Sequence, residues 1–384
     1  MSSERLFRPV KKAKNFLFLA CLLFFISSVF GRTHYLISEQ QALAQDSIER
    51  IVAKEVAKLM KLPGYTAFSG VIYIKGTARQ FHYGKLSNGK KPNGNTVYEI
   101  GSITKTYTGL LLAQAVNDHK IKLDDDVRNY LDGKYPNLVL SNGKPITFRH
   151  LITHTSGLPL VMNCDEKGQT TAEQAVCFDH FKEADFFKAL KTIKPIDNSG
   201  NYHYSGVGIQ LVRYILEHVY QLSFQELFKK YVFSRSGEQQ TFSELKYGQN
   251  SNISLGKNSD GVPVPLINGF YKYAGGMKSS TNSMLNYMRM YLESNDKVVK
   301  QAMDRLAGSM QYGRAYAWNT YDYDKKKKML YHNGSSFGHS SWIALYPNQK
   351  VGIFIVTNVV TADSQGKLNE LSNSIIDSII SGSS

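Results

Sequence analysis

Strand-forming segments lie near both ends of this chain, and the sequence between them has the pattern of helices and loops. Turn residues separate five short β-rich segments, at residues 65–76, 79–84, 328–334, 340–347 and 351–359. Apolar residues recur at helical spacing in residues 46–61 and again from Leu368 to Ile379. The pattern predicts an α+β fold. Both chain ends supply strands to one mostly antiparallel sheet, and the terminal helices cover a face of it.

The same pattern divides the chain. We expect residues 1–31 to be a signal peptide or membrane anchor and residues 32–384 to form one folded region. Within that region the α/β part is expected at about 46–100 and 266–384, and an all-helical part at about 101–265. The chain has 384 residues and a hydrophobic content of 42%, which is enough for a sizeable core and argues against global disorder.

The N-terminus has the layout of an export signal. Basic residues between Arg5 and Lys14 precede an apolar run at residues 15–30. This run is shorter than the roughly 20 residues that a helix needs to span a bilayer. The bulky Phe30 makes a mediocre cleavage site, so an uncleaved anchor through residues 15–30 stays open as an alternative. We therefore expect a periplasmic or otherwise extracytoplasmic protein, with possible membrane attachment through this run.

The charge balance is strongly basic. Without residues 1–31 the formal net charge falls from +15 to about +11, because five basic side chains and Glu4 are removed. Such a surface suits a protein that works near anionic envelope polymers or membranes, although lysines that merely solvate the surface explain it equally well. The sequence carries no nucleic-acid-binding motif, and no nucleic-acid partner is expected.

Two cysteines, Cys164 and Cys177, remain after the N-terminal segment. In an oxidising compartment they could form a disulfide that stabilises the fold by about 3 kcal/mol, and unpaired thiols are the alternative. No His or second Cys pair lies at metal-ligand spacing around them, which argues against a zinc site. No metal or organic cofactor is expected.

Residues 98–116, YEIGSITKTYTGLLLAQAV, run from a polar start into a long apolar stripe and predict a buried helix over residues 102–118. Ser102 and Lys105 are spaced to lie on one face, within hydrogen-bond reach. Burial lowers the pKa of a lysine amine, which lets it act as a base toward the hydroxyl. The helix N-terminus offers N–H groups to a developing oxyanion. In the alternative interpretation, Ser102 merely caps the helix.

Five segments resemble the class C β-lactamases and related penicillin-recognising serine hydrolases. Residues 98–131 resemble the nucleophile region, and GKPITFRHLITHTSGLP looks like the loop that follows it. YHYSGVGIQLVRYILEHV is similar to the tyrosine segment, and AGGMKSSTNSMLNYMRMYL to a later helix start. YHNGSSFGHSSWIALYPNQKVGIFIVTN resembles the final sheet edge and its partner strand. The segments occur in family order over roughly residues 46–380, which implies a β-lactamase/transpeptidase-like fold with an all-helical insertion.

The resemblance also implies roles for individual residues. Ser102 matches the acylated nucleophile and Lys105 its proton-handling partner. Tyr204 matches the tyrosine that serves as general base, and a phenol near ammonium groups is expected to have a lowered pKa. The backbone N–H groups of Ser102 and Ser335 would form the oxyanion hole.

Two departures from the family pattern bear on the substrate. Gly206 stands where the family commonly has an asparagine that holds substrate and lysine. His332-Asn333-Gly334 replaces the lysine-threonine-glycine of true β-lactamases, so an imidazole that titrates near neutrality would meet an anionic substrate. Gly334 is expected where substrate backbone approaches the strand edge. His154 is expected to be structural.

These observations predict an exported serine hydrolase that works through an acyl-enzyme. D-Alanyl peptides of peptidoglycan are the expected substrates, together with β-lactams as their mimics, and the departures predict slow β-lactam turnover at best. Two alternatives stay open: an esterase of the same family that acts on small acyl esters, and a non-hydrolytic penicillin-binding-type protein.

Overall fold

The structure, a computed structural model, describes residues 48–164, 170–197, 200–245, 252–324 and 327–381. The chain forms two units, Met1–Lys54 with Asp377–Ser384, and Glu55–Ile376. In the first unit the described residues, 48–54 and 377–381, are helical. The expected leader or anchor at residues 1–31 lies outside the described residues. Within the described ranges, no helix combines the length and apolar character that crossing a membrane requires.

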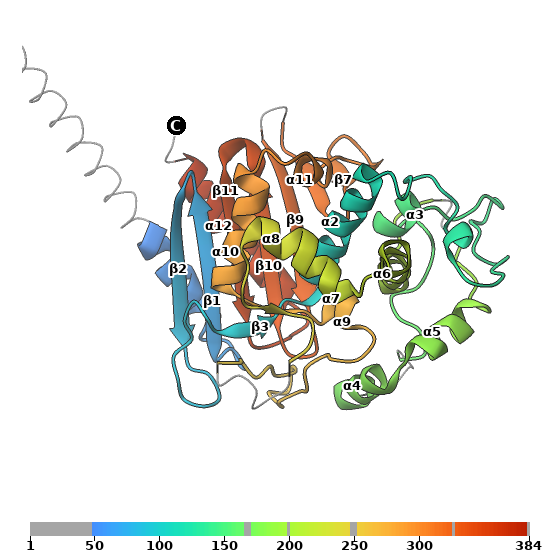
Figure 1. Cartoon of the computed structure of the whole chain (residues 1–384). Helices are drawn as coiled ribbons and strands as arrows, with labels where there is room; N and C mark the ends of the chain where they lie inside the picture. Colours follow the sequence, from blue (N-terminus) through green and yellow to red (C-terminus); the bar gives the residue numbers. More distant parts are fainter. Residues whose placement is uncertain (1–47, 165–169, 198–199, 246–251, 325–326, 382–384) are drawn as a thin grey trace, which may run out of the picture. The chain divides into compact units, whose positions relative to one another are not determined.

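An eight-stranded sheet with the spatial order β2-β1-β11-β10-β9-β8-β7-β6 lies in the second unit (Figure 1). Its strands are β1 (Ala67–Ile74), β2 (Thr77–Gly84), β6 (Ala307–Gly308), β7 (Tyr312–Arg314), β8 (Asn319–Asp322), β9 (Lys328–Ser335), β10 (Ser340–Tyr346) and β11 (Val351–Thr357). Strand β1 pairs antiparallel with β11, with Phe68 opposite Thr357 and Ile74 opposite Val351. The predicted sheet built from both chain ends is therefore confirmed.

The central strands explain why the terminal segments carry the clearest strand signal. Strands β10 and β11 are buried along their whole length, and β1 along nearly all of it, so apolar or small residues occupy both faces. Strands β6, β7 and β8 were not predicted. They are short and carry few apolar β-formers, and antiparallel pairing outward from β9 establishes them.

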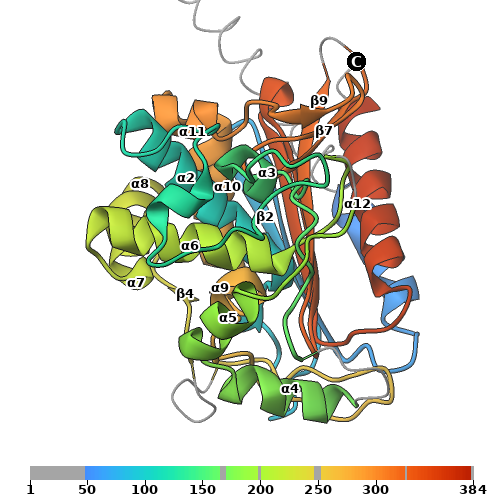
Figure 2. The same ribbon diagram turned by 90° about the vertical axis from the view of Figure 1, so that its right-hand side faces the viewer.

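Helices cover both faces of the sheet (Figure 2). Helix α10 (Thr281–Glu293) packs against β1, β10 and β11. Residues 364–376 of α12 (Ser364–Ser381) lie along the opposite face, where Leu368, Leu371 and Ile376 are buried. The helical period read from the C-terminal sequence therefore marks the face of α12 that meets the sheet.

The chain between the two groups of strands is mainly helical. Its elements are α2 (Thr104–Asn117), α3 (Phe148–Ile152), α4 (Thr171–His180), α5 (Glu183–Leu190), α6 (Gly206–Tyr220), α7 (Phe224–Leu227), α8 (Ser234–Ser236) and α9 (Lys272–Gly275), and α11 (Lys297–Gln301) follows α10. A second sheet, not predicted, has the order β3-β5-β4 and consists of β3 (Val97–Glu99), β5 (Lys278–Ser280) and β4 (Thr241–Phe242).

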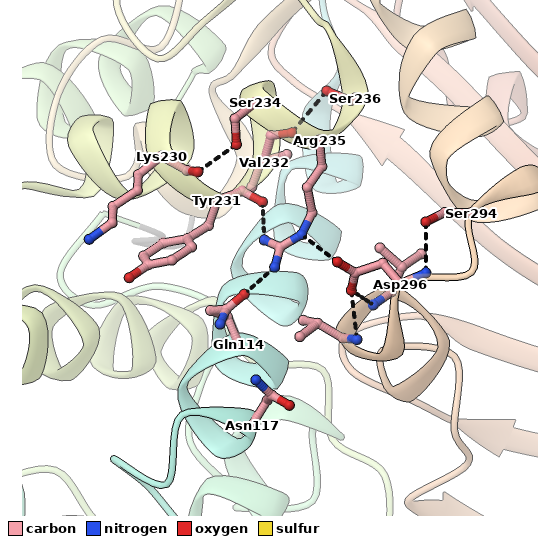
Figure 3. A network of polar contacts seen from close by, with 12 residues as sticks. Gln114, Asn117, Lys230, Tyr231, Val232, Ser234, Arg235, Ser236, Ser294 and Asp296 are labelled. Carbon is pink, nitrogen blue, oxygen red and sulfur yellow. Dashed lines mark hydrogen bonds and ion pairs between the residues drawn. The ribbon is translucent and has the colours of Figure 1, made fainter.

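Helix α2 lies at the centre of the helical part, and its residues from Thr104 to Ala115 are all buried. A polar network holds its C-terminal half (Figure 3). Arg235 of α8 donates hydrogen bonds to the Gln114 side chain and to Asp296, which in turn caps the first N–H groups of α11. These contacts tie three helices together and fix the orientation of α2.

Candidate active site

Ser102 lies in a 3₁₀ turn, η1 (Gly101–Ile103), that leads directly into α2. The N-cap residue of α2 is Ile103, and no side-chain capping bond is present at either element, so the interpretation of Ser102 as a helix cap is wrong. One turn later, Lys105 donates a hydrogen bond from Nζ to Ser102 Oγ at 2.9 Å. The spacing of three residues therefore brings hydroxyl and amine into direct contact.

The turn is anchored to the segment before β5. Thr104 donates a hydrogen bond from Oγ1 to the Gly101 carbonyl at 2.6 Å and accepts one from the Met277 N–H at 3.2 Å. The Ile100 N–H donates to the Met277 carbonyl at 2.9 Å. Thr104, rather than the serine, supplies the side-chain oxygen that organises this helix start.

Two glycines let the turn touch strand β9 backbone to backbone. Gly101 has a φ of +54°, and a Cβ there would lie 2.4 Å from the Ser335 nitrogen. A Cβ on Gly334 would lie 2.1 Å from the Ile100 carbonyl oxygen. The chain's own Ile100 thus makes a close approach to Gly334. The expected approach of a substrate backbone to this strand edge stays a prediction. The contact brings the N–H of Ser335 beside the turn that carries Ser102.

Lys105 is buried, with 2% of its surface exposed, and desolvation lowers the pKa of its amine to about 7. A second hydrogen bond from Nζ reaches the Ala274 carbonyl at the end of α9. Among the residues that the structure describes, none forms an ion pair with this amine or raises its pKa. A neutral amine is therefore available near pH 7 to accept the proton of Ser102.

Tyr204 faces the same amine, and Lys105 Nζ lies 4.9 Å from the centre of its ring. Burial raises the pKa of the Tyr204 phenol, and a hydrogen bond with Ser102 offsets only part of that rise. The prediction of a lowered pKa is wrong, because desolvation by burial is the largest influence on the phenol and it raises the pKa. Tyr204 stays protonated and is able to donate a hydrogen bond, whereas Lys105 is the group able to accept a proton.

His154 contacts the segment that carries Tyr204. Its Nδ1 accepts a hydrogen bond from the Ser205 N–H at 3.2 Å, and its ring centre lies 4.5 Å from that of Tyr204. Burial, reinforced by the charge of Lys105, lowers the pKa of His154 well below its usual value, so the imidazole is neutral. His154 does not line the cavity, and its contacts are those of a positioning residue.

His332 departs from the expectation of a titrating, substrate-facing imidazole. It is 2% exposed and does not line the cavity. Burial and then the charge of Lys105 lower the pKa of His332 to about 3. Its Nδ1 bonds to the Asn333 carbonyl at 2.7 Å. The prediction of titration near neutrality is wrong, because a buried imidazole beside a lysine resists protonation, and Asn333 and Ser335 face the cavity instead.

Gly206 begins α6 and lines the cavity. A Cβ at this position would lie 2.4 Å from the Leu160 carbonyl oxygen, which accepts a hydrogen bond from the Gly206 N–H at 3.1 Å. The close packing of this loop leaves no room for the amide side chain common in the family. The contact to Lys105 is provided by the Ala274 carbonyl, a backbone group that residue-type patterns do not reveal.

Cys164 and Cys177 are joined in a disulfide, with their Cα atoms 5.7 Å apart. Cys177 belongs to α4, and Cys164 lines the cavity. The bond therefore ties α4 to the loop that follows α3. Within the described residues, no cluster of His, Cys, Asp or Glu has the arrangement of a metal site.

A cavity of about 500 Å³ opens in front of Ser102 and Lys105. Its other lining residues are Leu160, Val161, Cys164, Gln174, Phe178, Tyr202, Tyr204, Gly206, Ile267, Tyr271, Ala274, Gly275, Asn333, Ser335, Ser336 and Phe337. The sequence reasoning missed the aromatic wall formed by Phe178, Tyr271 and Phe337. Only Phe337 lies in a segment that resembles the family. Nothing in the local sequence pattern marks Phe178 or Tyr271 as site residues.

Comparisons with known proteins agree with this geometry. A family model described as Beta-lactamase matches residues 52–373. The chain is 24% identical to a beta-lactamase of Yersinia enterocolitica over 364 residues, 83% of this chain and 89% of the relative. It is 27% identical to a beta-lactamase of Pseudomonas fluorescens over 314 residues, 79% of this chain and 81% of the relative.

A solved structure described as Beta-Lactamase/D-Alanine Carboxypeptidase from Pseudomonas syringae superposes with a TM-score of 0.72 at 18% identity, covering 86% of this chain and 99% of that one. At this identity the likeness shows a common fold. The family model spans most of the chain, including every residue of the site described above. The chain therefore belongs to the beta-lactamase family and has its serine-hydrolase fold.

Proposed function

We propose that the protein is a serine hydrolase that forms an acyl-enzyme on Ser102. The observation that carries the proposal is the 2.9 Å hydrogen bond from Lys105 Nζ to Ser102 Oγ, made by an amine whose pKa burial lowers to about 7. A buried, partly neutral lysine within hydrogen-bond reach of a hydroxyl is the arrangement that activates a serine nucleophile.

In the acylation step Ser102 Oγ attacks the substrate carbonyl and its proton passes to Lys105. The N–H groups of Ser102 and Ser335 stabilise the oxyanion that forms. The close contact of Gly101, the residue before Ser102, with the Ser335 nitrogen supports this role. When the tetrahedral intermediate collapses, the bond to the leaving group breaks. The proton then moves to the leaving group, with the neutral Tyr204 hydroxyl as relay. Water then attacks the acyl-enzyme, and the neutral Lys105 amine accepts its proton. The bond to Ser102 Oγ breaks, and the proton returns to the serine.

The substrates expected from the sequence, D-alanyl peptides of peptidoglycan and β-lactams, belong to this proposal. The name of the Pseudomonas syringae structure, which includes D-alanine carboxypeptidase, supports peptide substrates. An extracytoplasmic location, with the basic surface near anionic envelope polymers and attachment through residues 15–30, completes it. The neutral, buried His332 favours a second candidate, an esterase, because no imidazolium is present to hold a substrate carboxylate.

Covalent labelling tests the proposal. The purified full-length protein is incubated with a fluorescent penicillin and with a fluorophosphonate, and adducts are measured by intact mass. We expect an adduct with at least one reagent, located on Ser102 and absent from Ser102→Ala. Ser336→Ala, which removes another hydroxyl from the cavity lining, keeps the adduct. An adduct that persists in Ser102→Ala contradicts the assignment, and no adduct with either reagent favours a non-hydrolytic binding protein.

A further inference from the structure

Among the residues that the structure describes, the lining of the cavity in front of Ser102 is almost free of charge. Of these lining residues only Lys105 carries an ionisable amine, and none is Asp, Glu, Arg or His. That amine is already engaged by Ser102 and by the Ala274 carbonyl. The substrate group that enters this space therefore meets hydroxyls, amides and apolar side chains rather than a dedicated cation.

A substrate carboxylate would lose hydration here without gaining a strong counter-ion. His332 is neutral and lies behind the lining. The amine of Lys105 has a pKa of about 7 and must be neutral to act as a base, so a carboxylate that held it as ammonium would oppose catalysis. Burying a charge without a partner is unfavourable, and the cavity thus disfavours an acyl chain that carries a carboxylate.

The walls of the cavity favour apolar groups instead. Phe178 of α4 has its ring centre 4.6 Å from that of Tyr271 and 5.2 Å from that of Phe337. Leu160, also part of the lining, is 50% exposed. The disulfide of Cys177 holds α4, and with it Phe178, against the loop that carries Leu160.

Arg314 is a cation that contacts a residue of the cavity lining. Its guanidinium lies 4.2 Å from the ring centre of Tyr202, a lining residue, and Nη1 donates to the Gly313 carbonyl. Arg314 itself does not line the cavity. If the site accepts an anionic substrate, Arg314 is therefore the residue to substitute in a control experiment.

From these observations we propose that the site takes uncharged acyl groups with an aliphatic or aromatic chain and discriminates against acyl groups that carry a carboxylate. The inference rests on the proposed acyl-enzyme at Ser102. For an aryl ester, the bond from Ser102 Oγ to the acyl carbon forms, the bond to the phenol oxygen breaks, and the phenol leaves with the proton. Water then releases the carboxylic acid and restores the serine hydroxyl.

A matched pair of esters tests the discrimination. The full-length protein is assayed with p-nitrophenyl hexanoate and with the mono-p-nitrophenyl ester of adipic acid, which has the same chain length and a terminal carboxylate. We expect kcat/KM to be at least tenfold higher for the hexanoate after subtraction of background hydrolysis. Equal values, or a preference for the adipate, overturn the proposal. A preference for the adipate that is lost in Arg314→Gln also overturns it, and places the carboxylate at that arginine.

Two lysine substitutions sharpen the test. Leu160→Lys puts a cation on the cavity wall and is expected to narrow the preference for hexanoate at least fivefold. Met310→Lys adds the same charge at a side chain that is 86% exposed outside the cavity, and should leave the ratio unchanged. An equal change in both variants contradicts the proposal, because it assigns the effect to overall charge.

Labelling separates this inference from the proposed function. Fluorophosphonate titration of Ser102 in every preparation counts the competent sites. A protein that is labelled but prefers the adipate refutes only the discrimination. A protein that is not labelled and hydrolyses neither ester refutes the acyl-enzyme itself and the discrimination with it.

Discussion

Among the residues that the structure describes, two lysines are buried, Lys105 and Lys278, and they differ in the groups around their amines. Lys105 on α2 donates to Ser102 and to the Ala274 carbonyl. Lys278 on β5 is fully buried as well and also donates to a backbone carbonyl, that of Ile267. Only Lys278 has an acid beside it: its Nζ lies 3.9 Å from a Glu99 carboxylate oxygen.

The difference decides what each amine can do. Burial lowers the pKa of both, but Glu99 opposes the shift at Lys278, whereas nothing among the described residues opposes it at Lys105. Burial acts to raise the pKa of Glu99, and His339 and Lys278 more than offset this, so the carboxyl is held ionised. One amine therefore belongs to a structural ion pair, and the other is free to exchange a proton with a serine.

The largest expected effect comes from removing the proposed base. Lys105→Met should lower kcat/KM for ester hydrolysis by about 10²- to 10⁴-fold, because the serine loses its proton acceptor. The midpoint of thermal unfolding should hold or rise, since a buried amine without a counter-ion is replaced by an apolar chain. Near-normal hydrolysis by Lys105→Met would contradict the distinction between the two lysines.

The matched change at the other lysine should act on stability. Lys278→Met leaves Glu99 buried without its cation and is expected to cost about 3–5 kcal/mol of unfolding free energy in urea denaturation. The double variant Glu99→Gln/Lys278→Met should recover part of that loss. A single variant as stable as the parent would show that the ion pair has no structural role.

The pH dependence of kcat/KM should report the titration of Lys105. Lys105 must be neutral, so activity should fall about tenfold per pH unit below a midpoint near 7, its pKa in the fold. Glu238, whose pKa burial raises to about 7, titrates in the same window and provides the control. Glu238→Gln and His332→Ala should keep the limb, and its disappearance in either variant would reassign the titration.

The lowered pKa of Lys105 should also affect how the unfolding free energy depends on pH. Its pKa is lower in the folded state than the value of about 10.4 of an unfolded lysine, so between about pH 7 and 10.4 the unfolded state binds more protons. The unfolding free energy, relative to that of Lys105→Met, should therefore rise with pH across this range. A flat difference would mean that the amine is charged in the fold.

The smallest expected effect comes from giving Lys105 the partner it lacks. Gly275 lines the cavity next to Ala274, and a Cβ there would have no described atom within 4 Å apart from its chain neighbours and its own helix backbone. Gly275→Asp should stabilise the ammonium and move the acid limb of kcat/KM upward by about one pH unit. Gly275→Asn matches the shape without the charge, and an identical limb in both variants would contradict the electrostatic account.

Local pattern was sufficient where the interactions are local. Runs of apolar residues predict the strands around Phe68, Ile343 and Phe354 and the buried helix after Ser102. Helical spacing predicts the contact of Ser102 with Lys105. The hairpins of β6–β8 were missed because strand pairing, rather than residue type, forms them.

Electrostatic expectations failed for a different reason. The pKa of Tyr204 was expected to be lowered by neighbouring ammonium groups, and that of His332 to stay at the ordinary histidine value. Burial dominates both pKa shifts instead. The layers that bury them come from distant parts of the chain. The Ala274 carbonyl, 169 residues beyond Lys105, shows the same dependence, since no sequence pattern connects the two.

The sequence by itself determined the strands near both chain ends, the buried helix after Ser102 and the pairing of Ser102 with Lys105, because these depend on residue periods over a few turns. The family came from the resemblance of five ordered segments. Only the tertiary structure decided that Lys278 has a counter-ion while Lys105 has none within the described ranges, and that Gly101 and Gly334 let a turn rest on a strand. The physical reason is that desolvation, charge pairing and backbone contact arise between residues far apart in the chain.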